Sequence, residues 1–159
     1  MHCKTIAALL ALASASGVSA QTAVATVAPA IDFSMAAAAP GSWVYSAQPG
    51  ASEARFIGAG GTVRLTLRCI RATRQVSISH ASGVPSPTIS VWTSTAARAL
   101  PARFEPTTMR VTANVSAYDP LLDAIAFSRG RIAVTLAGSA ALVVPAWPEA
   151  ARTIEDCRN

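Results

Sequence analysis

The alternation of apolar and polar residues is clearest at residues 62–69, where the sequence reads TVRLTLRC. Apolar side chains fall at every second position, with arginine and threonine between them: Val63, Leu65, Leu67 and Cys69 against Arg64, Thr66 and Arg68. A period of two is typical of a strand with one buried and one solvated face. The pattern therefore predicts that Cys69 points inward at the end of this strand.

Other short segments also have strand character, because their apolar residues alternate or cluster between turn-forming residues. They are residues 42–45, 55–57, 76–80, 88–93, 109–117, 132–136 and 141–144. Residues 96–106 are expected to be irregular, since Pro101 and Pro106 exclude a central strand. Together these segments predict a mainly β fold, an antiparallel β-sandwich or open barrel of about eight short strands.

Two short helices are expected in the C-terminal third of the chain. Asp119 followed by proline is a good helix start, and a glycine at position 130 closes that segment. The last helix opens at Pro148, and its spacing puts three residues on one face: Ala150, Ile154 and Cys157. Cys157 is therefore expected to face the interior.

The first twenty residues have the pattern of a secretory signal, with Lys4 near the start, an apolar run at 6–13 and small residues at 18–20. A rival interpretation is an uncleaved anchor, but the run is shorter than the roughly 20 apolar residues that a membrane span needs. Cleavage before Gln21 leaves no transmembrane segment and places the protein in the periplasm or outside the cell. We expect a signal peptide (1–20), a flexible Ala/Pro-rich tether (21–40) and a single β-rich domain (41–159).

Export changes the expected state of the cysteines. Cys3 leaves with the signal, so two cysteines remain in an oxidising compartment, and they are most simply one disulfide between Cys69 and Cys157. A metal site is not expected, because His80 is the one histidine that follows the signal and no third soft ligand accompanies the pair.

The positive charge after cleavage is carried by arginine alone, since Lys4 is the sole lysine. Arg64 and Arg68 lie on the polar face of the predicted central strand, with Arg71 and Arg74 at the following turn. Four guanidinium groups within reach of one another suit carboxylate or phosphate groups on a polymer or partner. A solvated strand face that discourages aggregation is the alternative interpretation of the same residues.

Two further residues, Trp92 and His80, could contact a partner or take part in catalysis. Trp92 lies on the polar face of its strand, where it is either covered by another element or used for contact with a partner. His80 is in register with the apolar face of its strand, which favours a buried residue near the core edge over a catalyst. No Gly-x-Ser-x-Gly motif accompanies it, and the acidic residues of the C-terminal third fit helix starts and helix-surface pairs.

Four segments carry a resemblance to known proteins: WVY at 43–45, LTLRC at 65–69, DPLLDAIAFSRGRIAV at 119–134 and LVVPAWPEAARTIEDCR at 142–158. In this order they resemble small exported bacterial proteins of no assigned activity. More distantly, the chain is similar to the invasion-associated locus B family and to VasI-type accessory proteins of type VI secretion. The resemblance covers residues 41–159 and implies a periplasmic all-β domain. It implies no functional residues.

The sequence thus favours a non-enzymatic binding or envelope-accessory module that uses no cofactor. The expected partner is an unknown envelope protein or an anionic polymer, without specific recognition of nucleic acid. The alternative is a hydrolase-type enzyme that uses His80. The sequence does not define the oligomeric state.

Overall fold

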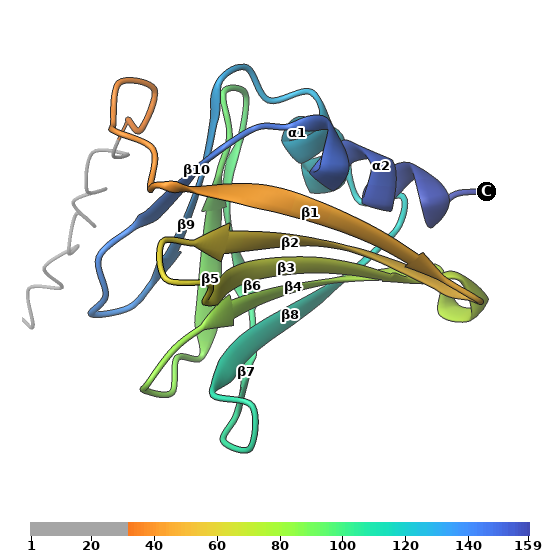
Figure 1. Ribbon diagram of the computed structural model, residues 1–159, viewed down its shortest axis with the longest axis horizontal. Helices are drawn as coiled ribbons and strands as arrows, with labels where there is room; N and C mark the ends of the chain where they lie inside the picture. Colours follow the sequence, from red (N-terminus) through yellow and green to blue (C-terminus); the bar gives the residue numbers. More distant parts are fainter. Residues whose placement is uncertain (1–31) are drawn as a thin grey trace, which may run out of the picture. The chain divides into compact units, whose positions relative to one another are not determined.

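The computed structural model describes residues 32–159, and these form ten strands and two α-helices (Figure 1). The predicted signal peptide and residues 21–31 lie outside the described residues. The strands are β1 Gly41–Gln48, β2 Ala51–Gly58, β3 Val63–Ile70, β4 Gln75–Ala81, β5 Thr88–Trp92, β6 Ala97–Pro101, β7 Arg103–Glu105, β8 Arg110–Ser116, β9 Arg131–Leu136 and β10 Leu142–Pro145. The helices are α1 Pro120–Ala126 and α2 Pro148–Asp156, and a short 3₁₀ turn, η1 Arg71–Thr73, joins β3 to β4.

The strands form two antiparallel sheets, one of six strands in the order β1-β2-β3-β4-β8-β7 and one of four in the order β10-β9-β5-β6. This confirms the predicted mainly β antiparallel fold with two helices near the C-terminus, and it selects the sandwich alternative. Residues 96–106 differ from expectation, because they contain β6 and β7. Each of these strands lies at a sheet edge, where Pro101 does not interrupt a hydrogen-bonded ladder on both sides.

One face of the six-stranded sheet is buried, and we call it the inner face. Period-two alternation puts apolar side chains on it from five strands. They include Trp43, Ala54, Phe56, Leu65, Leu67, Cys69, Val76, Ile78, Val111, Ala113 and Val115. The predicted inward face of residues 62–69 is therefore confirmed, with Leu65, Leu67 and Cys69 all at 2% exposure or less.

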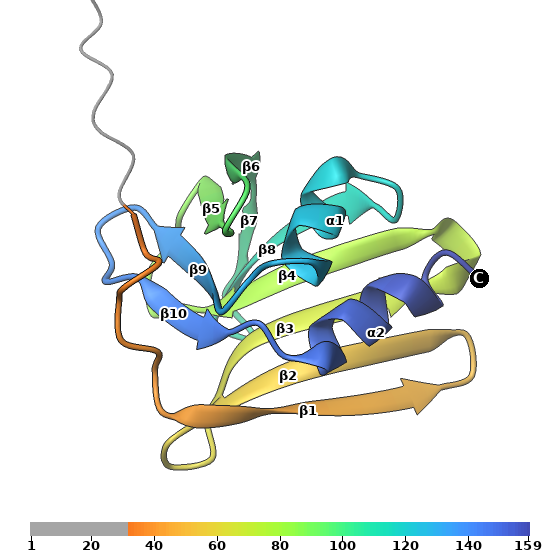
Figure 2. The same ribbon diagram turned by 90° about the horizontal axis from the view of Figure 1, so that it is seen from above.

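Two different layers cover the inner face (Figure 2). The four-stranded sheet covers one end, and α1 and α2 cover the other, with α2 packed against β1, β2 and β3. Side chains from both layers join the same core cluster, among them Val91, Val134, Leu122 and Ile154. The opposite face of the six-stranded sheet is left without a covering layer from the described residues (Figure 2).

Helix α1 begins as its sequence predicts. The Asp119 carboxylate accepts a hydrogen bond from the Leu121 N–H at 2.8 Å, and proline occupies the first helical position. The helix ends at Ala126, earlier than the predicted end near Gly130. The Ser128 hydroxyl accepts from the Ser94 N–H and donates to the Arg131 carbonyl, so the chain turns toward β9 at that point.

The segment before β1 contacts the domain. The Ala39 N–H donates to the Val143 carbonyl at 2.7 Å, and Arg131 donates to the Ser34 carbonyl at 2.7 Å. The described part of the segment predicted as a tether, residues 32–40, is thus held against the four-stranded sheet. Within residues 32–159, neither helix has the length and apolar character needed to cross a membrane.

Candidate binding surface

The uncovered face of the six-stranded sheet, here called the outer face, is polar and basic. Because side chains alternate along each strand, the register fixes which residues share this face. Arginines reach it from β2, β3, β7 and β8, and the acidic residues are one glutamate each from β2 and β7. The charged residues are Arg55, Arg68, Arg103, Arg110, Glu53 and Glu105.

A line of hydroxyl groups crosses the centre of the outer face between two arginines. Residues that pair from β2 to β7 lie abreast in the order Arg55, Thr66, Ser79, Thr112 and Arg103. The Ser79 and Thr112 hydroxyl oxygens are 2.8 Å apart and share a hydrogen bond. With strands about 4.8 Å apart, the two arginine positions stand roughly 19 Å from each other. This spacing suits an extended partner better than a compact one.

Arg110 is held rigidly on the outer face. Its guanidinium donates to the Ser79 carbonyl at 2.6 Å, to the Thr66 hydroxyl at 3.1 Å and to the Val63 carbonyl at 3.3 Å. Burial lowers the pKa of Arg110 from its ordinary value, while the charge of Glu53 acts in the opposite direction. The group therefore keeps a fixed position across β3 and β4 while two of its five N–H donors stay unused by these bonds.

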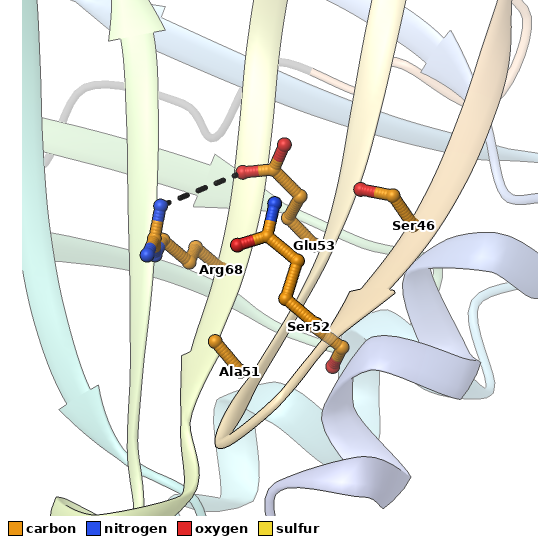
Figure 3. A pocket seen from close by; sticks show the side chains of 6 residues that line it. Ser46, Ala51, Ser52, Glu53 and Arg68 are labelled. Atoms are coloured by element: carbon orange, nitrogen blue, oxygen red, sulfur yellow. Dashed lines mark ion pairs between the residues drawn. The ribbon is translucent and has the colours of Figure 1, made fainter.

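Glu53 is close to two arginines, and Figure 3 shows one of them, Arg68, beside it. Its carboxylate is 3.2 Å from Arg55 Nε and 3.9 Å from Arg68 Nη1. A hollow of about 150 Å³ beside them is lined by Ser46, Gln48, Ala51, Ser52, Glu53 and Arg68, but it does not admit a water-sized sphere. The hollow at this point of the outer face is therefore too tight to hold a small molecule.

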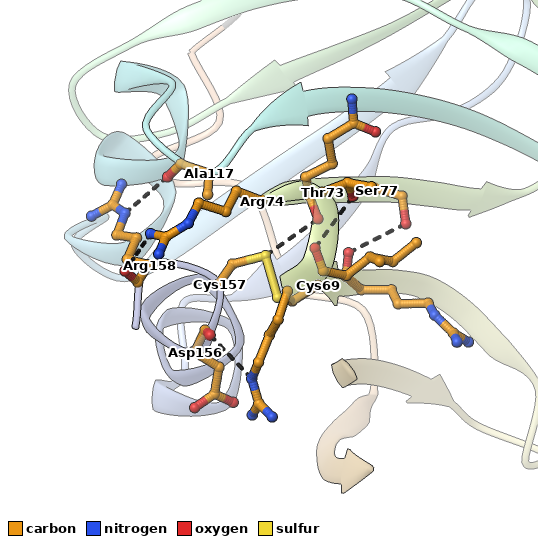
Figure 4. The surroundings of a disulfide bond; sticks show 12 residues. Cys69, Thr73, Arg74, Ser77, Ala117, Asp156, Cys157 and Arg158 are labelled. Carbon is orange, nitrogen blue, oxygen red and sulfur yellow. Dashed lines mark hydrogen bonds between the residues drawn. A yellow bond between two sulfur atoms is a disulfide. The ribbon is translucent and has the colours of Figure 1, made fainter. Parts of the chain in front are cut away.

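Two of the four arginines predicted as an anion-binding cluster hold the end of α2 (Figure 4). Arg71 donates to the Asp156 carbonyl at 3.3 Å, and Arg74 donates to the Arg158 carbonyl at 2.8 Å and to the Tyr118 hydroxyl. Cations beside the free carbonyl groups of a helix C-terminus are stabilising. Arg71 and Arg74 therefore serve the helix end and lie away from the outer face.

The structure does not bring Arg64 together with Arg71 and Arg74. Arg64 lies at the start of β3, where the pairing with β2 shifts register between Phe56 and Ile57, and its side chain passes beside Gly58. Arg71 follows the other end of the same strand. Of the predicted four, Arg68 is the one that shares the outer face with Arg55, Arg103 and Arg110.

Cys69 and Cys157 form a pair with disulfide geometry. Their Sγ atoms are 2.20 Å apart, their Cα atoms 5.4 Å apart, and both side chains are fully buried. The pair joins the end of β3 to the residue that follows α2 (Figure 4). It therefore connects the inner face of the six-stranded sheet to the helix that covers it.

His80 lies on the inner face, opposite Leu65 on one side and Val111 on the other. It is 6% exposed, and neither ring nitrogen has a hydrogen-bond partner among the described residues. Burial lowers the pKa of His80 from its ordinary value; the Ala81 backbone opposes this, and the charges of Arg64 and Arg110 add to it. The ring is thus neutral near pH 7, and it holds no hydroxyl nucleophile.

Trp92, the candidate aromatic contact, is partly buried. The ring of Phe33 packs against it edge-on, with centroids 5.8 Å apart.

Among residues 32–159, no three His, Cys, Asp or Glu side chains form a group that could hold a metal ion.

The sequence signal for Arg55, Arg103 and Arg110 is weaker than the signal that singled out residues 62–69. Arg110 stands on the polar side of a clear alternation, but its neighbours depend on β8 pairing with β4, which a single chain pattern does not show. Arg103 lies in a three-residue strand next to Pro101 and gives no alternation.

Comparison of the chain with protein-family models, with curated proteins and with solved structures finds no match.

Proposed function

We propose that this protein is an exported, disulfide-bonded, non-enzymatic binding module that recognises an anionic polymer or anionic envelope partner through the outer face of its six-stranded sheet. The observation that carries the proposal is the convergence of four arginines from four strands on one uncovered, hydroxyl-rich surface. Guanidinium and hydroxyl donors together match carboxylate, sulfate or phosphate groups repeated along a chain.

Export is the second part of the proposal, and two observations support it. Residues 1–20 have the pattern of a secretory signal. Cys69 and Cys157 are placed for a disulfide, a bond that persists in the periplasm or outside the cell. A periplasmic or secreted location would expose the outer face to the anionic polymers of an envelope.

The test measures retention of the exported protein on immobilised heparin, an anionic polymer, over a gradient of NaCl. We expect binding that weakens with salt, because exposed charge interactions are screened. Replacing Arg68→Ala and Arg103→Ala together should lower the NaCl concentration of elution clearly, since both side chains are exposed and both stand on the outer face.

The matched control is the double variant Arg98→Ala plus Arg129→Ala, which removes the same charge from positions outside the outer face. We expect it to elute close to the parent protein. Circular dichroism checks that both double variants keep the fold. Equal shifts in the two double variants would mean that net charge alone governs retention, and the outer face would then be an ordinary solvated surface.

A further inference from the structure

The two edges of the six-stranded sheet are unequal. One edge is β7, which has three residues, and the other is β1, which has eight and pairs with β2 along its whole length without a register shift. The sequence of β1, GSWVYSAQ, contains no charged residue and no proline. Exposed edges in native sheets are commonly short, charged, bulged or interrupted by proline. β1 carries none of these protections.

Contacts with the end of β10 and with helix α2 hold β1 in place. The Trp43 indole N–H donates to the Pro145 carbonyl at 2.8 Å, and the Tyr45 hydroxyl donates to the Asp156 carboxylate at 2.5 Å. The Arg152 guanidinium stacks over the Tyr45 ring at 4.2 Å from its centroid. A strand fixed in this way loses little conformational freedom when another strand pairs with it.

No strand of residues 32–159 pairs with the outward edge of β1, and the side chains of β1 itself are apolar or neutral. Val44 points to the outer face and is 39% exposed, although it is a large apolar residue on an edge strand. A second β1 could lie against this edge without opposing like charges, because the strand has none of its own.

A two-fold axis beside β1 would also bring the surface above this edge against the same surface of a second copy. Helix α2 runs in the same direction as β1 (Figure 2), so pairing two copies through antiparallel β1 strands also sets their α2 helices antiparallel. An open groove of about 390 Å³ beside Tyr45 is lined by Pro148, Glu149 and Arg152. Because both residues line this groove, the two-fold axis would bring Glu149 of one copy toward Arg152 of the other, twice over.

We propose that β1 pairs with β1 of a second copy of this chain, which makes one continuous antiparallel sheet across a symmetric dimer. Residues that pair across two strands point to the same face of the sheet. A two-fold axis at the middle of β1 therefore sets Val44 opposite Val44 of the second copy, or Tyr45 opposite Tyr45. In either register the two outer faces join into a single surface. The dimer is independent of any anionic ligand, so its test is separate from the heparin experiment.

The experiment measures the mass of the oxidised, exported full chain by size-exclusion chromatography with light scattering over a range of concentrations. We expect a concentration-dependent dimer for the parent protein. Val44→Lys should raise the dissociation constant by about tenfold or more, because it places like charges across the two-fold axis. The matched control is Ile70→Lys, which adds a lysine at a 43% exposed apolar residue of an internal strand and should leave the dimer intact.

A charge-reversal pair keeps the proposal falsifiable if Val44→Lys does not fold. Glu149→Arg and Arg152→Glu should each weaken the dimer, and the two together should restore it, since the pairs reform in reverse. A parent protein that stays monomeric at every concentration would overturn the proposal. A dimer that survives both Val44→Lys and the single reversals, in variants with parental circular dichroism, would overturn it as well.

Discussion

The Cys69–Cys157 pair allows a sharp quantitative prediction, tested by replacing one or both cysteines with alanine. The bond would close a loop of 88 residues in the unfolded chain. Chain entropy alone then gives a stabilisation of about 4.6 kcal/mol at 25 °C, an upper figure because residual structure in the unfolded state reduces it. Single domains are stable by about 5 to 15 kcal/mol in total. Loss of the bond should therefore bring the protein close to unfolding.

Non-additivity distinguishes a bond from ordinary packing. If Cys69 and Cys157 are bonded, either single alanine variant removes the whole bond, so each should cost nearly as much as the double variant. If they are two separate thiols, each replacement should cost only its packing, and the coupling should not exceed the roughly 0.5–3 kcal/mol of neighbouring buried side chains. A double-mutant cycle separates these outcomes, with a coupling energy of several kcal/mol expected for the bond.

The assay is urea unfolding under oxidising conditions, followed by tryptophan fluorescence, since the Trp43 ring is buried, its indole N–H is bonded to the Pro145 carbonyl, and its environment changes on unfolding. The same titration in reducing agent provides a control with no mutation. Reduction should lower the unfolding midpoint of the parent protein and leave the double alanine variant unchanged. Additive small costs, or a parent protein insensitive to reductant, would refute the proposed disulfide.

Two further predictions concern stability and pH. Burial lowers the folded-state pKa of His80, so the unfolded chain binds a proton first as the pH falls below about 6.5. The free energy of unfolding should therefore decline from there toward the folded-state pKa, by at most about 1.4 kcal/mol per pH unit. His80→Leu should flatten this decline and leave stability at pH 8 equal or higher, as measured by urea unfolding at several pH values; an unchanged decline would contradict it. The hydrogen bond from Arg98, aided by the Leu121 N–H, lowers the pKa of Asp119. The ionised carboxylate therefore stabilises the folded state above pH 3.8, and this stabilisation is lost as the pH falls toward the folded-state pKa of Asp119. Asp119→Ala should cost about 1 kcal/mol at pH 7 and Asp119→Asn clearly less, because asparagine still caps α1; equal costs by thermal unfolding would show that the ion pair dominates.

The sequence predicted the features that depend on neighbouring residues. Strong period-two alternation identified β3 and its buried face, and the Asp119 cap identified the start of α1. The pairing of Cys69 with Cys157 was expected from two cysteines on inward faces, once the predicted signal peptide had removed Cys3. Each of these inferences needs only a short stretch of sequence or the number of cysteines in the chain.

The candidate surface was harder to predict, because it depends on how distant strands are ordered and on one local irregularity. The register of β2 against β3 shifts between Phe56 and Ile57, beside Arg64, and the sequence of β3 alone does not indicate this irregularity. The turn after β3 lies beside the end of α2, so Arg71 and Arg74 meet helix carbonyl groups that no local pattern indicates. Arg103 joins the surface through the pairing of β7 with β8.

The arrangement of the outer-face arginines bears on how they would bind. A solvated arginine loses considerable side-chain freedom when it contacts a partner, and that loss weakens binding. Here Arg110 is already fixed by three acceptors and Arg55 by the Glu53 carboxylate, yet each keeps N–H donors beyond those bonds. Arg68 and Arg103 remain more exposed beside them. The outer face thus combines two guanidinium groups held by protein partners with two more exposed ones, an arrangement that supports the proposed recognition of repeated anionic groups.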